Sequence, residues 1–220
     1  MFHRLNLILP DKVFDGAMQM ALDEALLLSV ETPTLRVYSW ESPCVTFGYF
    51  QKLSEVKLIN LELPSVRRWT GGGIVLHGED LTFSLVIPHS EKAASMPSTL
   101  FYKSLHSRLA SWLACLLPME VRLVTDAEVC EGSACFSAPA CDDLLINGRK
   151  GLGGALRRSH GGLLYQGSLQ FPNALSLDPK SMAGALCETL IIKTLKEEVL
   201  TEAERIAKSR YSTTEWGDRR

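Results

Sequence analysis

The chain has 220 residues, of which 46% are hydrophobic, and a formal net charge of −2 at pH 7. This length and composition suffice for a buried core in one large domain or two small ones. The small net charge argues against binding to nucleic acid or to an anionic membrane by bulk electrostatics. No apolar run approaches the roughly 20 residues that span a bilayer, and the N-terminus lacks the pattern of a signal peptide. We therefore expect a cytoplasmic protein.

The six cysteines are expected to be free thiols, because a chain of this length without a secretory signal rarely depends on a disulfide framework. Three of them, Cys130, Cys135 and Cys141, lie close together in the sequence. Their spacing differs from the short cysteine pairs that are typical of zinc sites. The sequence motifs therefore predict no metal site.

Helical and strand patterns alternate in the first half of the chain. Apolar residues recur at intervals of three and four over residues 14–30, which predicts an amphipathic helix with Asp15 as its N-cap. Two charged residues, Asp23 and Glu24, interrupt the apolar run of this helix. Strand patterns follow, in chain order, at residues 34–40, 44–49, 65–70 and 81–87.

The second half continues this mixture. Residues 97–117 have a helical period, with Ser98 as the expected cap and Pro118 just after the end. We predict strands at 121–124, 143–146, 150–158 and 163–171, an irregular segment at 126–140, and helices at 181–190 and 197–210. Asn147 and Gly148 form the strongest hairpin signal. Strands with helices grouped around them indicate an α+β fold, with one domain over residues 1–220 and a single mixed, largely antiparallel sheet flanked by helices.

The stretch R-R-W-T-G-G-G-I-V-L-H carries the strongest chemical signal of the sequence. Gly71, Gly72 and Gly73 have no Cβ atom, so the backbone N–H groups of such a turn can approach a ligand and form an anion site. Arg67 and Arg68 add planar, multiply hydrogen-bonding charge. A glycine triplet also suits an ordinary hairpin turn. The arginines before it and the histidine after it favour a ligand-binding loop.

These residues resemble the signature R-R-x-[ST]-G-G-G-x-V-x-H of the lipoate–protein ligase family, which belongs with biotin ligases and octanoyltransferases. Two motifs before it, M-A-L-D-E-A-L-L and R-V-Y-S-W-E-S-P-C-V-T-F-G-Y-F-Q, match as well. Downstream, I-N-G-R-K-G-L-G-G-A-L-R-R is similar to the family pattern N-G-K-K-x-x-G-x-A-x-R-R and gives Lys150 the position of the family's lysine. The resemblance covers nearly the whole chain in the right order, and it implies the catalytic-domain fold of biotin and lipoate ligases.

The resemblance implies an enzyme that joins an eight-carbon acyl group, lipoyl or octanoyl, to one lysine of a lipoyl carrier domain through an amide bond. The implied partners are carrier domains of 2-oxoacid dehydrogenase E2 subunits and the glycine cleavage H protein. Lys150 would stabilise the developing oxyanion, a contribution of typically a few kcal/mol for a preorganised donor. An acyl chain needs an apolar slot, which Trp69, Val75 and Leu76 beside the glycines suit.

Further residues complete the expected substrate- or nucleotide-binding set. His77 lies on the same strand face as Val75, so it is expected to face a ligand without taking part in proton transfer. Gly153, Gly154 and Ala155 belong to the second motif.

Two routes of acyl activation remain open. A ligase would form acyl-AMP from free acid with ATP and Mg²⁺, and Gly73 favours this route, because related transferases carry a larger residue there. A transferase would need no cofactor and would take the octanoyl group from acyl carrier protein onto Cys135, since C-F-S-A-P resembles a segment of one octanoyltransferase class. A neighbouring Lys150 would favour its thiolate.

The ATP-dependent ligase is the leading hypothesis, and the thioester transferase is the alternative. A third possibility is an inactive acyl- or carrier-binding module, although the loop, the arginines and Lys150 are all present. We expect no C-terminal accessory domain within these 220 residues, so a ligase would take that function from a separate protein. Gln166 stands where many relatives have a histidine, which weakens the transfer of any role to that position.

Overall fold

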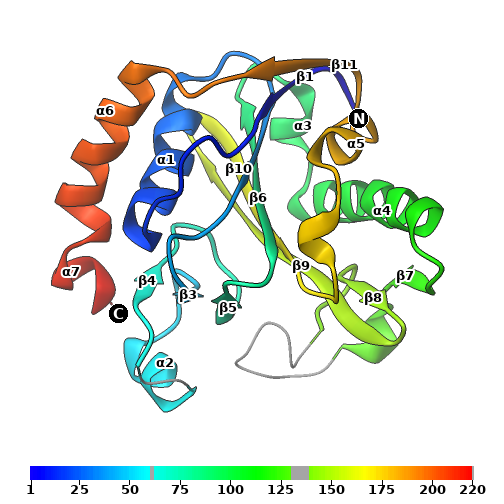
Figure 1. Cartoon of the computed structure of the whole chain (residues 1–220), viewed down its shortest axis with the longest axis horizontal. Coiled ribbons are helices and arrows are strands. Elements are labelled where there is room, and N and C mark those ends of the chain that lie inside the picture. Colours follow the sequence, from blue (N-terminus) through cyan, green and yellow to red (C-terminus); the bar gives the residue numbers. More distant parts are fainter. Residues whose placement is uncertain (60–61, 130–138, 220) are drawn as a thin grey trace.

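A computed structural model describes residues 1–59, 62–129 and 139–219, and its centre is a large mixed β-sheet with helices on both faces (Figure 1). The eight strands follow the spatial order β11-β1-β2-β6-β10-β9-β8-β7. Their bounds are β1 Phe2–Ile8, β2 Thr34–Tyr38, β6 Leu81–Pro88, β7 Val121–Leu123, β8 Leu144–Ile146, β9 Arg149–Ser159, β10 Gly162–Leu169 and β11 Cys187–Lys193. β1 pairs in parallel with β11 and β2, and the other neighbours are antiparallel. The predicted α+β class is confirmed.

A second, three-stranded sheet stands beside the large one. It has the order β4-β3-β5, with β3 at Cys44–Phe47, β4 at Ser65–Arg67 and β5 at Val75–His77. The prediction of a single sheet is therefore wrong. Alternating apolar residues identified β3 and β4 as strands, but this pattern does not specify which strands pair.

Helices cover both faces of the large sheet (Figure 1). One face packs against α1 (Gly16–Ser29) and α6 (Glu197–Ile206), and the other against α4 (Ser98–Leu116) and α5 (Pro179–Gly184). The shorter elements are α2 Leu53–Ile59, α3 Lys92–Ser95, α7 Thr214–Gly217, the 3₁₀ turns Asp126–Glu128 and Ala174–Ser176, and the π turn Ala207–Tyr211. Within the described chain, none of these helices has the length and apolarity needed to cross a membrane.

Side chains that alternate along the strands divide the core into two layers. On β6, Phe83, Leu85 and Ile87 pack toward α4 and α5, whereas Val86 packs toward α1 and α6. This period of two is the one that the sequence shows, and it places polar residues of β6 and β10 on the α1 side, where the small sheet also lies.

Helix caps and ends agree with the sequence in part. The Asp15 carboxylate accepts a hydrogen bond from the Met18 N–H at 2.8 Å, so the predicted cap of α1 is confirmed. The predicted cap of α4 is wrong, because Pro97 holds the N-cap position and Ser98 is the first helical residue.

The predicted helix at 181–190 is also wrong over its second half. α5 ends at Gly184, and the chain continues as β11, parallel to β1. β-Branched residues such as Thr189, Ile191 and Ile192 favour this strand. The sequence did not predict β1 or α2, whereas the strand face expected for Val75 and His77 is that of β5. The predicted irregular segment at 126–140 falls largely outside the described residues.

The two charges within α1 have buried partners. Arg36 of β2 lies 2.7 Å from the Asp23 carboxylate, with side-chain exposures of 3% and 0%. Ser84 and Gln166 donate to the same carboxylate at 2.7 Å each. Glu24 pairs with Arg210 of the C-terminal π turn. Asp23 and Glu24 therefore fix α1 to three strands and to the C-terminal helical region.

We predict that Arg36→Met lowers the free energy of unfolding by about 3–5 kcal/mol, because it leaves the Asp23 carboxylate buried without its counter-charge. Urea unfolding measures this loss. The matched control is Arg205→Met, which breaks the exposed pair with Glu202 and should cost less than about 1 kcal/mol. An Arg36 variant as stable as this control would contradict the prediction.

Candidate functional site

A cavity of about 420 Å³ lies between the large sheet and the small sheet. Its walls come from β2, β6, β9 and β10, from β3 and β5, and from one side chain of α1. They are formed by Met20, Tyr38, Trp40, Thr46, Arg68, Val75, His77, Thr82, Gly153, Gly154, Ala155, Gln166, Gly167 and Ser168. Aromatic and apolar groups dominate one side, and glycines and Ala155 keep the β9–β10 side open. Such a cavity suits a slender, mostly apolar ligand.

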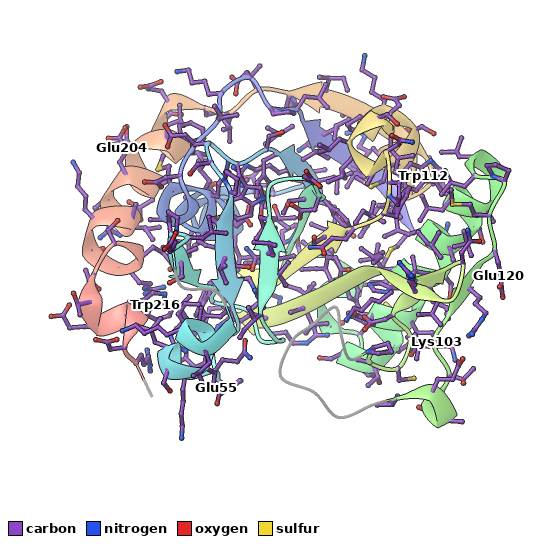
Figure 2. All side chains as sticks on the ribbon, turned by 60° about the horizontal axis from the view of Figure 1, so that its bottom comes forward. Glu55, Lys103, Trp112, Glu120, Glu204 and Trp216 are labelled. Atoms are coloured by element: carbon purple, nitrogen blue, oxygen red, sulfur yellow. The ribbon has the colours of Figure 1, made fainter. Side chains whose placement is uncertain are left out.

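A more open groove of about 1130 Å³ adjoins this cavity. Gly154 and Ala155 line both spaces, so the groove is continuous with the cavity wall. Gly71 and Gly72 line the groove from one side, and Lys103 of α4 lines it from another. Figure 2 shows this end of the molecule, with Trp216 and Lys103 on opposite sides of the view. Predicted binding residues from two distant motifs therefore meet here.

The glycine loop is shaped by the Arg68 guanidinium. Its NH2 group donates to the carbonyl oxygens of Gly71 and Gly73 at 2.9 and 2.7 Å, and its NH1 group donates to the Thr46 hydroxyl at 2.6 Å. Gly72 has a φ of 81°, a left-handed conformation that favours glycine. A Cβ atom at Gly71 would meet no heavy atom within 4 Å. The loop is thus held from inside and leaves open space at its first glycine.

Arg67 lies outside the cavity lining. Its side chain is fully buried and donates to backbone carbonyls at 2.6–2.9 Å. These acceptors are Tyr49, Gln51, Trp216, Gly217 and Arg219. The structure therefore brings Arg68 to the cavity and uses Arg67 to tie the C-terminal segment to the loop after β3.

His77 uses both ring nitrogens inside the protein. Its Nδ1 lies 2.8 Å from the Asp80 carboxylate, which only accepts, so Nδ1 carries the proton. Its Nε2 lies 2.8 Å from the Thr46 hydroxyl, which accepts from Arg68 and donates to the imidazole. Burial lowers the pKa of His77, and its ring stacks on Trp40 with centroids 4.3 Å apart. A neutral imidazole with both nitrogens occupied suits a wall of the cavity.

Asp80, Thr82 and Ser168 complete this polar wall and were not among the predicted site residues. Both hydroxyls donate to the Asp80 carboxylate, at 2.6 Å from Thr82 and 2.5 Å from Ser168. Burial works against ionisation of Asp80, but hydrogen bonds from His77 and these hydroxyls outweigh it and lower the pKa of Asp80. The sequence signal for two of them was the pair of polar residues three and five positions after His77 in H-G-E-D-L-T, which are Asp80 and Thr82.

Of the three residues expected to form an apolar slot, only Val75 lines the cavity. Leu76 is 55% exposed, because side chains alternate along β5 and Val75 and His77 take the inner face. Trp69 packs near α1 instead, and its ring lies 4.6 Å from the Arg157 guanidinium.

Lys150 lies at the start of β9, beside the cavity wall. Its Nζ is 2.6 Å from the Asp143 carboxylate, with side-chain exposures of 4% and 1%. A Cβ atom at Gly153 would lie 2.6 Å from Lys150 Cε and 2.9 Å from Nζ. Glycine at position 153 therefore makes room for the ammonium group next to the cavity. Asp143 was not a predicted site residue, although it precedes the hairpin that carries Lys150.

A neutral histidine lies behind this pair. His106 Nδ1 donates to the Asp142 carbonyl at 2.8 Å, so its Nε2 accepts from the Tyr165 hydroxyl at 2.6 Å. Burial lowers the pKa of His106 to about 3. The ring is therefore neutral at physiological pH.

Two of the described cysteines, Cys44 and Cys141, are poor nucleophiles in this setting. Burial raises the pKa of Cys44 to about 12, and a hydrogen bond to Asp126 raises the pKa of Cys141 to about 11. None of the described cysteines lines the cavity. Cys135, the predicted nucleophile, and Cys130 lie outside the described residues. In the described ranges, no three His, Cys, Asp or Glu side chains lie together as a set of metal ligands.

Comparisons with known proteins identify relatives over nearly the whole chain. Residues 15–202 match the family described as lipoyl protein ligase A/B catalytic domain. The chain is 34% identical to the octanoyltransferase LipM of Brevibacillus brevis. The alignment is 266 positions long with its gaps and covers 93% of this chain and 95% of that protein. The chain is also 34% identical to the LipM of Clostridioides difficile over 174 residues, 74% of this chain and 64% of that protein.

Solved structures share the fold. A putative lipoate protein ligase from Thermoplasma acidophilum with bound lipoic acid superposes with a TM-score of 0.74 and 22% identity, over 99% of this chain and 98% of that one. A lipoate-protein ligase A bound with ATP has a TM-score of 0.71 and 22% identity, with the same coverage of both chains. At this level of identity the likeness establishes the fold.

The buried His106 predicts a loss of stability in acid. Its folded pKa of about 3 lies below the ordinary 6.5, so its contribution is complete above pH 6.5 and is lost as the pH falls toward 3. The slope approaches about 1.4 kcal/mol per pH unit. His106→Asn keeps a donor and an acceptor without titrating, so its unfolding free energy in urea should depend less steeply on pH. The exposed His160→Asn is the control, and parallel curves for His106→Asn and wild type would contradict the assignment.

Proposed function

The chain belongs to the lipoyl protein ligase A/B catalytic-domain family, and from this premise we propose that it is an octanoyltransferase of protein lipoylation. It would move an octanoyl group from a carrier-bound thioester to a lysine of a lipoyl carrier domain. The observation that carries the proposal is the 34% identity to a protein named octanoyltransferase over 93% of the chain. This reverses the preference for an ATP-dependent ligase that Gly73 suggested.

The hydrogen bonds of Arg67 and Arg68 also favour a transferase over a ligase. Arg67 and Arg68 were expected to bind the phosphate of an acyl-adenylate, but they donate to backbone carbonyls, and Arg68 also to Thr46. A phosphate at the glycine loop would therefore compete with bonds that shape the loop. A thioester is neutral, so it would not compete for these hydrogen bonds.

The cavity suits the acyl chain. Met20, Tyr38, Trp40 and Val75 give it an apolar surface, which an acyl chain requires. We propose that the chain of the octanoyl group lies among these residues. Its carbonyl would then lie at the Gly153–Ala155 side, near the Lys150 ammonium and the open groove.

We propose Cys135 as the nucleophile. Its thiolate attacks the donor thioester, the carrier thiolate leaves, and an acyl-enzyme thioester forms. The amine of the acceptor lysine then attacks this carbonyl, the Cys135 thiolate leaves, and the amine proton is released. Lys150 would stabilise the oxyanion of each tetrahedral intermediate. The resemblance of C-F-S-A-P to a segment of one octanoyltransferase class supports Cys135.

This reaction needs neither ATP nor Mg²⁺. The proposed donor is octanoyl acyl carrier protein, and the proposed acceptors are the lipoyl domains of 2-oxoacid dehydrogenase E2 subunits and the glycine cleavage H protein. The acyl-adenylate route is the second candidate, because the space at Gly71 leaves room for a phosphate beside the cavity.

Donor use and Cys135 together test the proposal. The protein and an apo lipoyl domain are incubated with octanoyl acyl carrier protein, or with octanoate, ATP and Mg²⁺, and the domain is weighed by intact-mass spectrometry. We expect octanoylation from the carrier-bound donor alone, and one hydroxylamine-labile octanoyl group on the enzyme when the domain is omitted. Cys135→Ser should reduce transfer by roughly three orders of magnitude or more.

Cys115→Ser is the matched control, because its side chain is exposed on α4 and lines neither the cavity nor the groove. It should transfer at the wild-type rate. Activity with octanoate and ATP that survives Cys135→Ser would instead establish the ligase.

The contact between Gly153 and Lys150 gives a second prediction. Gly153→Ala places a methyl group where Cε and Nζ of Lys150 now lie, so the ammonium must move away from the cavity. A displacement of about 1 Å in a catalytic group costs up to about 100-fold in rate. We expect kcat to fall about 10- to 100-fold with little change in KM. Gly184→Ala, where a Cβ atom meets nothing within 4 Å, is the control and should leave both constants unchanged.

A further inference from the structure

A buried carboxylate stands behind the proposed oxyanion-stabilising lysine. Asp143 accepts from the Lys150 ammonium at 2.6 Å, from the Tyr102 hydroxyl at 2.5 Å and from the Ala140 N–H at 2.7 Å. These donors come from β9, from α4 and from the turn before β8. A carboxylate with fixed donors from three directions has little freedom, so the position of Asp143 determines the position of the Lys150 ammonium.

The same network reaches the cavity wall. The Gly154 N–H donates to the Tyr102 hydroxyl oxygen at 3.0 Å, and this hydroxyl donates its own proton to Asp143. Burial raises the pKa of Tyr102 well above its ordinary value, so the phenol remains a donor. Movement of Asp143 is thus coupled to Gly154, which lines both the cavity and the groove.

Charge balance gives this arrangement a function. In the proposed reaction the nucleophile is an anion before acylation and neutral afterwards, so it does not provide a constant negative charge. A buried ammonium without a compensating anion favours its neutral form, because desolvation penalises the charge. Asp143 carries its charge throughout the cycle, so it compensates the ammonium in the acyl-enzyme as well.

We propose that Asp143 is a positioning residue for acyl transfer, which keeps the Lys150 ammonium charged and aimed at the cavity wall when the second oxyanion forms. This inference rests on the proposed function, because it takes the role of Lys150 from there. Asp143 acts through Lys150 and needs no contact with substrate.

Other titratable groups around the pair do not supply this charge. Tyr102 and His106 of α4 and Tyr165 of β10 pack against the site. Burial holds His106 neutral by lowering its pKa, and burial raises the pKa of Tyr165 far above its ordinary value. Among these described neighbours, Asp143 carries the negative charge.

The test uses Asp143→Asn, which keeps the shape but removes the charge. In single-turnover transfer from acyl-enzyme to a lipoyl domain, we expect about a 100-fold slower step near pH 7 and an alkaline decline of rate that begins at least about one pH unit lower. KM for the domain should stay within about twofold. Glu120→Gln is the matched control, since its exposed carboxylate pairs with Arg122 outside the cavity and the groove. It should behave as wild type.

A second readout needs no activity. Trace labelling of amines with acetic anhydride, followed by peptide mass mapping at several pH values, reports whether Lys150 is charged. Lys150 should become reactive at lower pH in Asp143→Asn than in wild type or Glu120→Gln. Failure of the wild type to transfer from either donor would refute the proposed function, while this labelling would still test the Asp143–Lys150 pair.

Folding is checked by thermal unfolding. Should Asp143→Asn not fold, Tyr102→Phe replaces it, because this change frees Asp143 on one side and leaves its charge in place. Tyr102→Phe should slow transfer about three- to tenfold without moving the pH profile. Wild-type rates, pH profile and Lys150 labelling in a folded Asp143→Asn variant would overturn the proposal, as would a loss that appears in KM alone.

Discussion

Two arginines that are adjacent in the sequence hold the glycine loop and the C-terminal segment through their buried guanidinium groups. Arg68 holds the carbonyls of Gly71 and Gly73 from inside, and through Thr46 it sets the tautomer of His77. Arg67 points the other way and gathers carbonyls of the C-terminal segment and of the loop after β3. Because each donor is directional, the loop cannot shift without breaking several charge-assisted hydrogen bonds.

Directional hydrogen bonds also hold the buried charges of Asp23 and Arg36 next to the cavity. Asp23 binds Arg36 and Gln166, and Gln166 in turn accepts from Thr70 at 2.7 Å, just before the glycine loop. Burial of such groups costs more than their attraction returns unless every lone pair is satisfied. The gain is preorganisation: the helix α1, the loop and the strand β10 keep one relative position, so that a transition state meets donors already aligned.

Local chemistry was predictable from the sequence, and long-range pairing was not. Gly71 and Gly72 of the glycine loop line the groove together with Gly154 and Ala155, and the Lys150 ammonium lies against Gly153 beside the cavity. By contrast, an arginine before a glycine loop suits both a ligand and a backbone carbonyl. The fold determines which of these partners Arg67 has, because it brings the carbonyl of Trp216 to the guanidinium. Period-two alternation likewise identified β3 as a strand without naming the sheet that it joins.

The position of positive charge bears on the chemistry of activation. An acyl-adenylate carries a phosphate whose charge must be met beside the carbonyl, but the loop arginines are engaged with the protein backbone. The ammonium of Lys150 is already shared with Asp143. In the thioester route such a site has to stabilise one oxyanion, whereas the adenylate route adds the charge of a phosphate to that oxyanion. A thioester route requires only this oxyanion and a thiolate, so the committed cations of this cavity suit transfer between carriers.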